Sequence, residues 1–407
     1  MSDAAPPSIP HARSPILWGA YLACSWTWCI GMFLPAILMR DMGWMGFIIF
    51  AIPNVIGAAS MGWVLRSRAD SVRFVERHPG VIWWFSAITL AFHVFWMLWL
   101  MNFVRIAFPM PRVYMQIVAG VVIAFAIISQ RALRFNRMPR VAAVLITFSI
   151  SVLIATFIFP DITLATNEMA KAAPLAGSIA PLWMLPVMLF GFALAPYLDI
   201  TFHHARQELD TQRNGRIGFT IGFVLFFALM IVLTTRYAGV MAWALTGEPY
   251  PDTMILPPWL SAALAIHILG QWVFTFRVHY HGIRTIPGAQ SRQALLFIVL
   301  LIAGLLGLGA MKLPDYASLT GGEIVYRSFM GFYGLVFPTF ITYRFIQFKA
   351  DGKPISPIAA WIVIVIAMPM FWIGFMEREN IWLVPGVGVV ALGAMVLLAG
   401  RKKTTAP

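Results

Sequence analysis

Two histidines lie deep inside long apolar stretches of this sequence. His93 is near the middle of one stretch, with Thr89 four residues before it, and His267 is near the middle of another, with Gln271 four residues after it. An ionisable group at such depth in a membrane costs roughly 2.5–3.5 kcal/mol unless it is paired or hydrated. Because histidine changes its charge near neutral pH, either ring could bind a proton. The alternative is a neutral ring that is hydrogen-bonded to a carbonyl or hydroxyl group nearby.

Asp199 is a third candidate for such chemistry. It lies about two turns from the end of another apolar stretch, with His203 four residues later on the same helical face. Arg206 follows at the end of the stretch. This spacing predicts either an ion or proton site or an ion pair that anchors the end of a helix at the membrane surface.

The composition of the chain requires a lipid environment. Of 407 residues, 60% are hydrophobic and only 11% are charged, whereas a soluble domain has roughly 25% charged residues. The net charge of +13 would suit nucleic acid, but the basic residues lie in short connections between apolar stretches. We therefore expect the lipid bilayer as a partner and no nucleic acid.

Twelve apolar stretches approach the roughly 20 residues that a spanning helix needs, which predicts an all-α membrane protein of about 12 transmembrane helices. They lie near residues 15–39, 43–65, 80–104, 113–130, 141–160, 178–204, 216–237, 257–280, 293–311, 324–347, 357–376 and 380–400. Arg40, Asp41 and Met42 separate the first two stretches and predict a tight hairpin. A merged stretch would be too long for one span.

The connections between these stretches predict the orientation. Arginine and lysine gather in alternate connections, as in Arg131, Arg134, Arg137 and Arg140, and are sparse in the others. By the positive-inside rule, the basic side is cytoplasmic. We expect a cell inner (plasma) membrane protein with both termini in the cytoplasm. Residues 1–14 are expected to be a disordered cytoplasmic tail and not a signal peptide.

The first and sixth stretches contain helix-breaking residues. The first has Gly31 and Pro35, and the sixth has Pro186, Gly191 and Pro196. Proline removes a backbone hydrogen bond, and glycine lowers the cost of unwinding. The two stretches are five helices apart and cross the membrane in opposite directions. This is what a 5+5 inverted repeat with two further helices requires.

In this arrangement the chain resembles the inverted-repeat transporters of the amino acid–polyamine–cation superfamily, which have the LeuT-type fold. The sequence SWTWCIGMFLPAILMRDMGWMGFIIFAIPNVIGAASMGW is locally most similar to the first two core helices of sodium:solute symporters. The resemblance implies a first five-helix repeat at 15–160 and an inverted second repeat at 178–347. The helices at 357–400 are then accessory.

The resemblance also implies a binding site at the middle of the membrane, between helices one, three, six and eight. Helices three and eight become equivalents, so His93 and His267 are expected to face one central cavity. Unwound backbone in helix one is expected to coordinate a ligand. The expected substrate- and ion-binding residues are Ser25, Thr27, Cys29, Gly31, His93, Gly191, Pro196, Asp199, His267 and Gln271.

The coupling ion is one point where this sequence departs from its relatives. Those that bind sodium between the first and eighth core helices use hydroxyl side chains on the eighth. Here the middle of that helix offers His267 and Gln271, while Ser261 lies nearer the outer end and Thr275 nearer the inner end. We therefore favour H⁺ over Na⁺, and both stay open.

Two readings from other classes also stay open. Histidines at the cytoplasmic ends of helices six and eight could hold a metal ion in a membrane enzyme, because imidazole binds zinc, copper or iron. These histidines are His203, His204, His279 and His281. The other reading is a transporter-like sensor that binds a solute without moving it.

The hypothesis from the sequence is a secondary active transporter of a small solute, working by alternating access. It is not expected to be an enzyme or to carry a cofactor, and it has no ATP-binding loop. The amide ends of half-helices favour an organic acid or a zwitterion, and a neutral solute also fits. The expected partners are this small-molecule substrate and a coupling ion.

Overall fold

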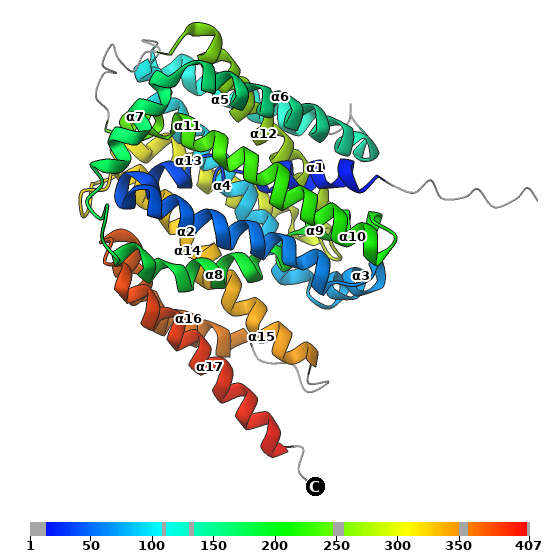
Figure 1. Ribbon diagram of the computed structural model, residues 1–407. Helices are drawn as coiled ribbons and strands as arrows, with labels where there is room; N and C mark the ends of the chain where they lie inside the picture. The colour runs from blue at the N-terminus through cyan, green and yellow to red at the C-terminus, as the bar shows by residue number, and fades with distance from the viewer. Residues whose placement is uncertain (1–13, 108–110, 130–133, 247–255, 350–356, 405–407) are drawn as a thin grey trace, which may run out of the picture.

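The computed structural model describes residues 14–107, 111–129, 134–246, 256–349 and 357–404, so the predicted tail lies outside these ranges except for Ser14. The regular secondary structure of the described residues is helical, apart from one isolated β-bridge between Tyr316 and Leu319 (Figure 1). The α-helices are α1 Pro15–Trp26, α2 Leu34–Val64, α3 Arg68–Arg77, α4 Pro79–Ala107, α5 Arg112–Ile128, α6 Met138–Ile158, α7 Pro160–Lys171, α8 Leu185–Leu194, α9 Ile200–Glu208, α10 Gln212–Thr220, α11 Ala228–Ala244, α12 Pro258–Thr285, α13 Gln293–Gly309, α14 Gly321–Gly331, α15 Phe337–Lys349, α16 Pro357–Met376 and α17 Leu383–Thr404. The 3₁₀ and π segments are η1 Phe135–Arg137, η2 Ala180–Met184, η3 Ala195–Leu198, η4 Ile221–Phe227, η6 Gln290–Arg292, η7 Ala310–Lys312, η8 Phe332–Val336 and η9 Asn380–Trp382.

The chain is an all-α, multi-pass membrane protein. Ten helical segments of the described residues are long and apolar enough to cross a membrane, and Val113–Ile128 adds a shorter apolar helix. One of the ten, α2, consists of two helical segments that meet at Gly43. With α2 divided there, each of the twelve predicted stretches corresponds to a helical segment.

The predicted hairpin between the first two stretches is present, and its turn is at Gly43. This residue has φ 65° and ψ −158°, a conformation that residues with a Cβ rarely adopt. A Cβ on Gly46 would meet the carbonyl oxygen of Leu38 at only 2.4 Å. The chain therefore folds back so sharply that only glycine fits where the two segments diverge.

The predicted interruptions of helices one and six are confirmed. In helix one, α1 ends at Trp26 and α2 begins at Leu34, with Pro35 in its first turn, so residues 27–33 are irregular. In helix six, α8 gives way to η3, which contains Pro196, and Asp199 is extended with ψ 111° before α9 begins. Both breaks start next to the glycine and proline residues that disfavour a continuous helix.

Helix one lies at the centre of the bundle. Every residue of α1 from Trp18 to Trp26 is buried, and α1 packs against α6, α10, α12 and η4. By contrast, α16 and α17 pack on each other and reach the bundle through α8 and α15, at its edge (Figure 1). The broken helices therefore have neighbours on all sides, while the last two helices are peripheral.

Two short helices occur where the sequence analysis expected only connections. In α3, the side chain of Ser67 and the carboxylate of Asp70 cap the first turn reciprocally. The Ser67 hydroxyl that donates to Asp70 also lowers the pKa of this carboxyl group. The second helix, α7, packs against α11, and the two lie at opposite ends of the bundle (Figure 1).

Helices seven and ten each contain a π-helical segment. In helix seven, η4 joins α10 to α11, and in helix ten, η8 joins α14 to α15. Such segments carry one residue more than the surrounding α-helix and are frequent at functional sites. Here η4 packs against α1 and η8 packs against α8, so each π segment lies beside one of the broken helices.

Candidate functional site

The unwound part of helix one is held by hydroxyl groups from three other helices. Each hydroxyl donates a hydrogen bond to a carbonyl oxygen at or beside the break. The bonds run from Thr275 to Cys24 (2.9 Å), from Tyr326 to Cys29 (3.0 Å), from Thr234 to Gly31 (3.0 Å) and from Tyr237 to Met32 (3.0 Å). A buried carbonyl group that has lost its helical N–H partner needs another hydrogen-bond donor, and these four hydroxyl groups are such donors.

These bonds change what the candidate residues of helix one can do. The hydroxyl groups of Ser25 and Thr27 donate back to the carbonyls of Leu22 and Ala23 in α1, so they do not point toward a ligand. The carbonyls of Cys29 and Gly31 already accept bonds. Thr275 of α12 reaches the carbonyl of Cys24, just before the break.

Removing one of these hydroxyl groups should cost stability. In Tyr326→Phe the buried Cys29 carbonyl loses this donor, and we expect a loss of about 1–3 kcal/mol, measured as a lower melting temperature in detergent. Tyr114→Phe, at an exposed tyrosine on α5, is the matched control and should change little. Equal losses in the two variants would contradict the assigned role of Tyr326.

Three enclosed spaces follow one another from the two breaks toward the Arg40 end of the bundle. The first, of about 10 Å³, is lined by Trp26, Trp28, Ile30, Asn54, Gly191, Phe192, Ala195 and Tyr333. The second, of about 60 Å³, shares Ile30, Gly191, Phe192 and Tyr333 with the first. The third, of about 230 Å³, shares Leu38, Met184 and Arg327 with the second. Together they trace a path that narrows toward the breaks.

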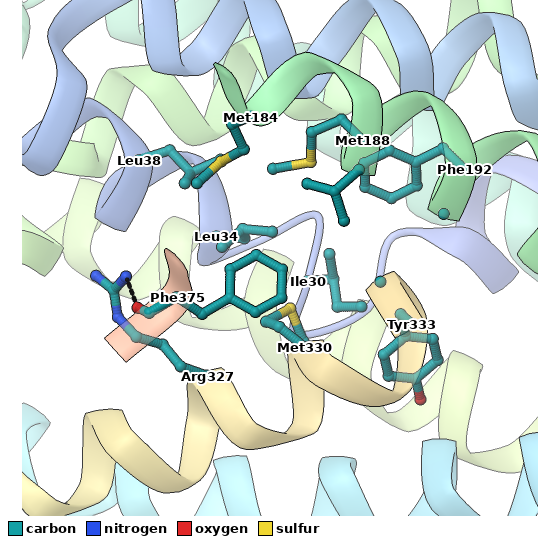
Figure 2. Close-up of a pocket in the computed structure, with 13 residues that line it drawn as sticks. Ile30, Leu34, Leu38, Met184, Met188, Phe192, Arg327, Met330, Tyr333 and Phe375 are labelled. Atoms are coloured by element: carbon teal, nitrogen blue, oxygen red, sulfur yellow. Dashed lines mark hydrogen bonds between the residues drawn. The ribbon is translucent and has the colours of Figure 1, made fainter. Parts of the chain in front are cut away.

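Most of the residues that line the first two spaces come from helices one, six and ten. Figure 2 shows Met184 of η2 and Met188 of α8 on one side of the second space and Met330 of α14 on the other, with Ile30 and Leu34 between them. Helices three and eight, which were expected to line the site, contribute no residue to these three spaces. Helix ten takes their place because η8 brings Tyr333 beside Gly191 of helix six.

Trp28 is the central side chain of the break. Its ring is buried and packs against five other rings. The distances between ring centroids are 4.8 Å to Trp26, 5.0 Å to Tyr333, 6.0 Å to Phe85, 6.0 Å to His279 and 6.2 Å to His93. Its Nε1 has no hydrogen-bond partner among the described residues. Because buried polar groups are normally paired, such an atom beside an enclosed space suits a ligand.

The two midplane histidines do not share a cavity. His93 contacts Trp28 and Trp272, and its Nδ1 lies 2.7 Å from the Thr89 carbonyl oxygen. The neighbour of His267 is instead Ser149 of α6, whose hydroxyl is 2.8 Å from Nδ1. Gln271 donates to the same hydroxyl at 3.5 Å. The expected single site is therefore two separate polar groups, on different sides of α12.

Asp199 also has a different partner from the one predicted. His203 turns away from it and contacts Ser71 and the Tyr197 carbonyl oxygen. Arg206 is buried and donates to the carbonyls of Leu65, Arg66 and Leu209, so it forms no surface ion pair with Asp199. The ionisable neighbour of Asp199 is His279 of α12, at 3.6 Å. Asp199 itself caps α9 and breaks helix six, so its extended backbone directs its side chain away from the i+4 position.

The four histidines of the alternative metal site do not gather into one set, although His204 and His281 are neighbours that both contact Phe135. His204 lies 3.2 Å from the Thr285 hydroxyl, and the ring of His281 stacks on Phe135. No group of three or more histidine, cysteine, aspartate or glutamate residues that could hold a metal ion occurs in the described part of the chain. The metal-enzyme reading thus finds no set of ligands brought together.

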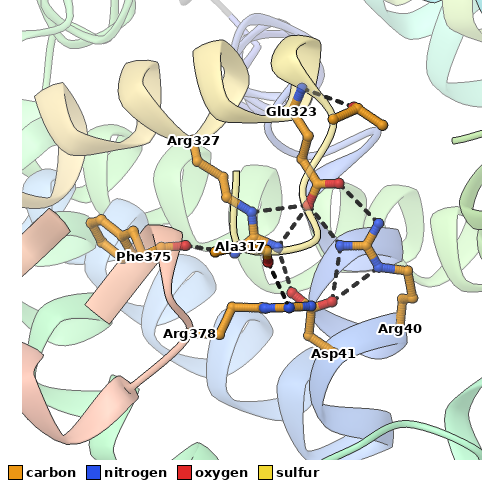
Figure 3. A network of polar contacts seen from close by, with 8 residues as sticks. Arg40, Asp41, Ala317, Glu323, Arg327, Phe375 and Arg378 are labelled. Carbon is orange, nitrogen blue, oxygen red and sulfur yellow. Dashed lines mark hydrogen bonds and ion pairs between the residues drawn. The ribbon is translucent and has the colours of Figure 1, made fainter. Parts of the chain in front are cut away.

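Sequence reasoning missed an ion network at the Arg40 end of the path (Figure 3). Arg327 of α14 donates to Asp41 and, at 2.9 Å, to Glu323, and Arg40 donates to Glu323 at 2.6 Å and to Asp41 at 2.9 Å. A further bond of 2.9 Å joins Arg327 to the carbonyl of Phe375 at the end of α16. The network ties helices one, ten and eleven together between the second and third spaces. An available signal was the Glu323–Arg327 pair, four residues apart at the start of an apolar stretch.

Comparison with known proteins gives a match at the level of structure only. No family model and no curated protein matches the chain. A structure of Mhp1, a nucleobase-cation-symport-1 family transporter, in a closed conformation with bromovinylhydantoin bound, matches with a TM-score of 0.52 and 10% identity, over 96% of this chain and 93% of that chain. The inward-facing conformation of Mhp1 matches with a TM-score of 0.51 and 14% identity, over 96% and 91%.

The chain has the fold of this transporter. It is the LeuT-type inverted-repeat fold that the breaks in helices one and six predicted. The matched structures belong to a family other than the sodium:solute symporters, so the resemblance of the first two helices holds at the level of the fold. Identities of 10% and 14% carry no assignment of substrate or ion.

Proposed function

We propose that this protein is a secondary active transporter that moves a small solute across the membrane by alternating access. The observation that carries the proposal is the enclosed path that ends where two broken helices meet. A solute bound there would lie midway through the bundle, where a change of tilt between helices can expose it to either side.

The lining of the space at the breaks favours a small, flat solute without net charge. The space at the breaks is walled by Trp26, Trp28, Phe192 and Tyr333, and none of its lining residues is charged. Aromatic rings bind flat solutes by stacking, and the unpaired Nε1 of Trp28 offers a hydrogen bond. One of the similar structures holds bromovinylhydantoin, a solute of this kind. Among the classes open from the sequence, a neutral solute therefore fits better than an organic acid.

The ion network would act as the outer barrier of the transporter. Arg327 lines both the second and the third space, so its bonds to Asp41 and Glu323 close the passage between them. A path open to this end would require helix ten to move away from helix one. The positive-inside rule supports this end as the outer one, with both termini in the cytoplasm. We infer the plasma membrane as the location of the protein.

The first test is a thermal-shift screen of the detergent-purified protein. The panel would contain uracil, hydantoin, neutral amino acids and small carboxylates, in sodium and in potassium, at about pH 5.5 and about pH 8, on either side of the ordinary histidine pKa. A solute at a hundred times its dissociation constant adds roughly 2.7 kcal/mol to the stability. We expect uracil or hydantoin to raise the melting temperature.

Uptake by proteoliposomes then separates a transporter from a sensor. A solute that stabilises the protein and accumulates inside liposomes under an ion gradient supports transport. A solute that stabilises it without entering would instead favour the sensor. If no solute in the panel stabilises the protein, but a transition metal stabilises it or a chelator destabilises it, the proposal is wrong.

A further inference from the structure

One acid and one base face each other at the break of helix six without a hydrogen bond between them. Asp199 ends η3 and caps α9, and its Oδ1 accepts bonds from the backbone N–H and the hydroxyl of Thr201, at 2.8 and 2.7 Å. Its other oxygen, Oδ2, lies 3.6 Å from Nε2 of His279 on α12. That distance is just beyond hydrogen-bond range.

Both side chains are fully buried and incompletely paired. Asp199 and His279 have no solvent exposure. Oδ2 of Asp199 and both ring nitrogens of His279 make no hydrogen bond to the described residues. A buried carboxylate beside an unpaired imidazole is costly, because no hydrogen bond compensates for the lost water. One added proton between the two atoms would remove that cost.

The surroundings offer no other counter-charge. The titratable groups that face the pair are Tyr21 of α1 and Tyr333 of η8 toward Asp199, and His93 of α4 and His204 of α9 toward His279. All four are neutral in their ordinary state near neutral pH or above it. Among the described ion pairs, none joins Asp199 to arginine or lysine. The charge of the pair is therefore set by its own protons.

We propose that Asp199 and His279 form a binding site for one exchangeable proton, and that this proton is the coupling ion. On uptake, the carboxylate and the neutral imidazole gain one H⁺ and become a hydrogen-bonded pair, and on release they return to their present state. No bond other than N–H or O–H forms or breaks. The role in transport rests on the proposed function, whereas proton binding itself does not.

Trp28 connects this pair to the solute. Its ring lies 6.0 Å from the ring of His279 at an angle of 67°, and it also lines the space at the breaks. A positive charge on His279 would be attracted to the indole ring. Asp199 is itself the point where helix six is extended, four residues after Ala195 of the same space. Proton uptake would thus act on Trp28, which lines the solute site, and on Asp199, where helix six is extended.

Sodium fits this position less well. A hard cation needs several oxygen ligands. Four carbonyl oxygens at the helix-one break already accept hydroxyl groups, and Oδ2 of Asp199 faces a nitrogen. A sodium ion here would need further oxygen ligands besides Oδ2 of Asp199, while a proton needs only the two facing atoms.

The test uses the full-length protein and two isosteric variants, Asp199→Asn and His279→Gln. Infrared difference spectra recorded during a pH titration in detergent report a protonated carboxyl group by its C=O band. We expect wild type to show such a band, Asp199→Asn to lose it, and His279→Gln to move its midpoint pH. Asp210→Asn, an exposed carboxylate, and His78→Gln, outside the membrane spans, are the matched controls and should leave the band unchanged.

Proton movement is then followed in proteoliposomes that contain a pH-sensitive dye, with uracil and hydantoin added outside. We expect wild type to carry protons inward with solute, and both variants to fall to the level of empty liposomes. A carboxyl band that persists in Asp199→Asn would overturn the proton site, whether or not solute moves. A wild-type uptake that follows a sodium gradient and ignores a pH gradient would overturn the coupling role alone.

Discussion

The Arg327→Met variant should lose about 3–5 kcal/mol of stability, the cost of leaving buried charges without their partner. Arg327 is 5% exposed and bonds both Asp41 and Glu323, which are themselves buried. Without it, Arg40 alone would face two carboxylates. The free energy of unfolding in mixed detergent–SDS micelles measures this loss, and the variant should also show easier access of water-soluble thiol reagents to a cysteine placed in the second space.

A double variant sharpens this prediction. Arg327→Met combined with Glu323→Gln removes one positive and one negative charge, which leaves the Arg40–Asp41 pair balanced. We expect the double variant to lose less than the sum of the two single losses, by roughly 0.5–3 kcal/mol. Arg73→Met, which breaks an exposed ion pair with Asp70, is the surface control and should cost at most about 1 kcal/mol. Additive losses would contradict a coupled network.

Replacing Gly191 with alanine should abolish solute binding. A Cβ at this position would meet the Tyr333 carbonyl oxygen at 2.9 Å, and that oxygen is part of the backbone of η8 and cannot turn away. Gly191 lines both the first and the second space, so the variant must shift helix six against helix ten at the site itself. We expect the melting-temperature rise caused by a bound solute to disappear, together with a stability loss of about 1–3 kcal/mol from overpacking.

Gly331→Ala is the matched control for this effect. Gly331 lies at the end of α14 with φ −58°, close to η8, and a Cβ there meets nothing within 4 Å. Alanine should therefore be tolerated, and the solute should stabilise this variant as it stabilises wild type. If Gly191→Ala keeps the full solute shift, the space between helices six and ten is not the binding site.

The helix breaks could be predicted from the sequence because their causes are local. Gly31 lies within the irregular residues of helix one and Pro35 follows them, and Pro196 precedes the extended Asp199 of helix six. Glycine and proline change the backbone at their own position, whatever packs around them. The capping pair Ser67 and Asp70 was an equally local signal for α3, and the sequence analysis overlooked it.

The partners of the buried polar residues could not be predicted in the same way. His93 and His267 were correctly placed inside their helices, but depth does not say which neighbour a side chain faces. A rotation of about 100° per residue separates the faces of a helix. Packing of α12 between α4 and α6 turned His267 toward Ser149. The same packing brought Thr275 to the break and His279 to Asp199.

The ion network shows the other limit of sequence reasoning. Arg327 and Asp41 are 286 residues apart, and the sequence analysis placed Asp41 only in the turn between the first two stretches. Their contact depends on how helices one and ten lean together, which no local pattern encodes. The one local clue was the i, i+4 spacing of Glu323 and Arg327, which predicts a shared face and says nothing of a third partner.

The π segments allow helices seven and ten to change length without a change at their ends. Each of η4 and η8 holds an extra residue within an otherwise α-helical stretch. If η8 relaxed to α-helix, that residue would pass to one side, and the segment beyond would advance by about 1.5 Å and turn by about 100°. Tyr333, in the middle of η8, would then swing out of the wall of the solute site. Helix ten could thus shift its register by one residue, with no hinge in a loop and no unfolding of its ends.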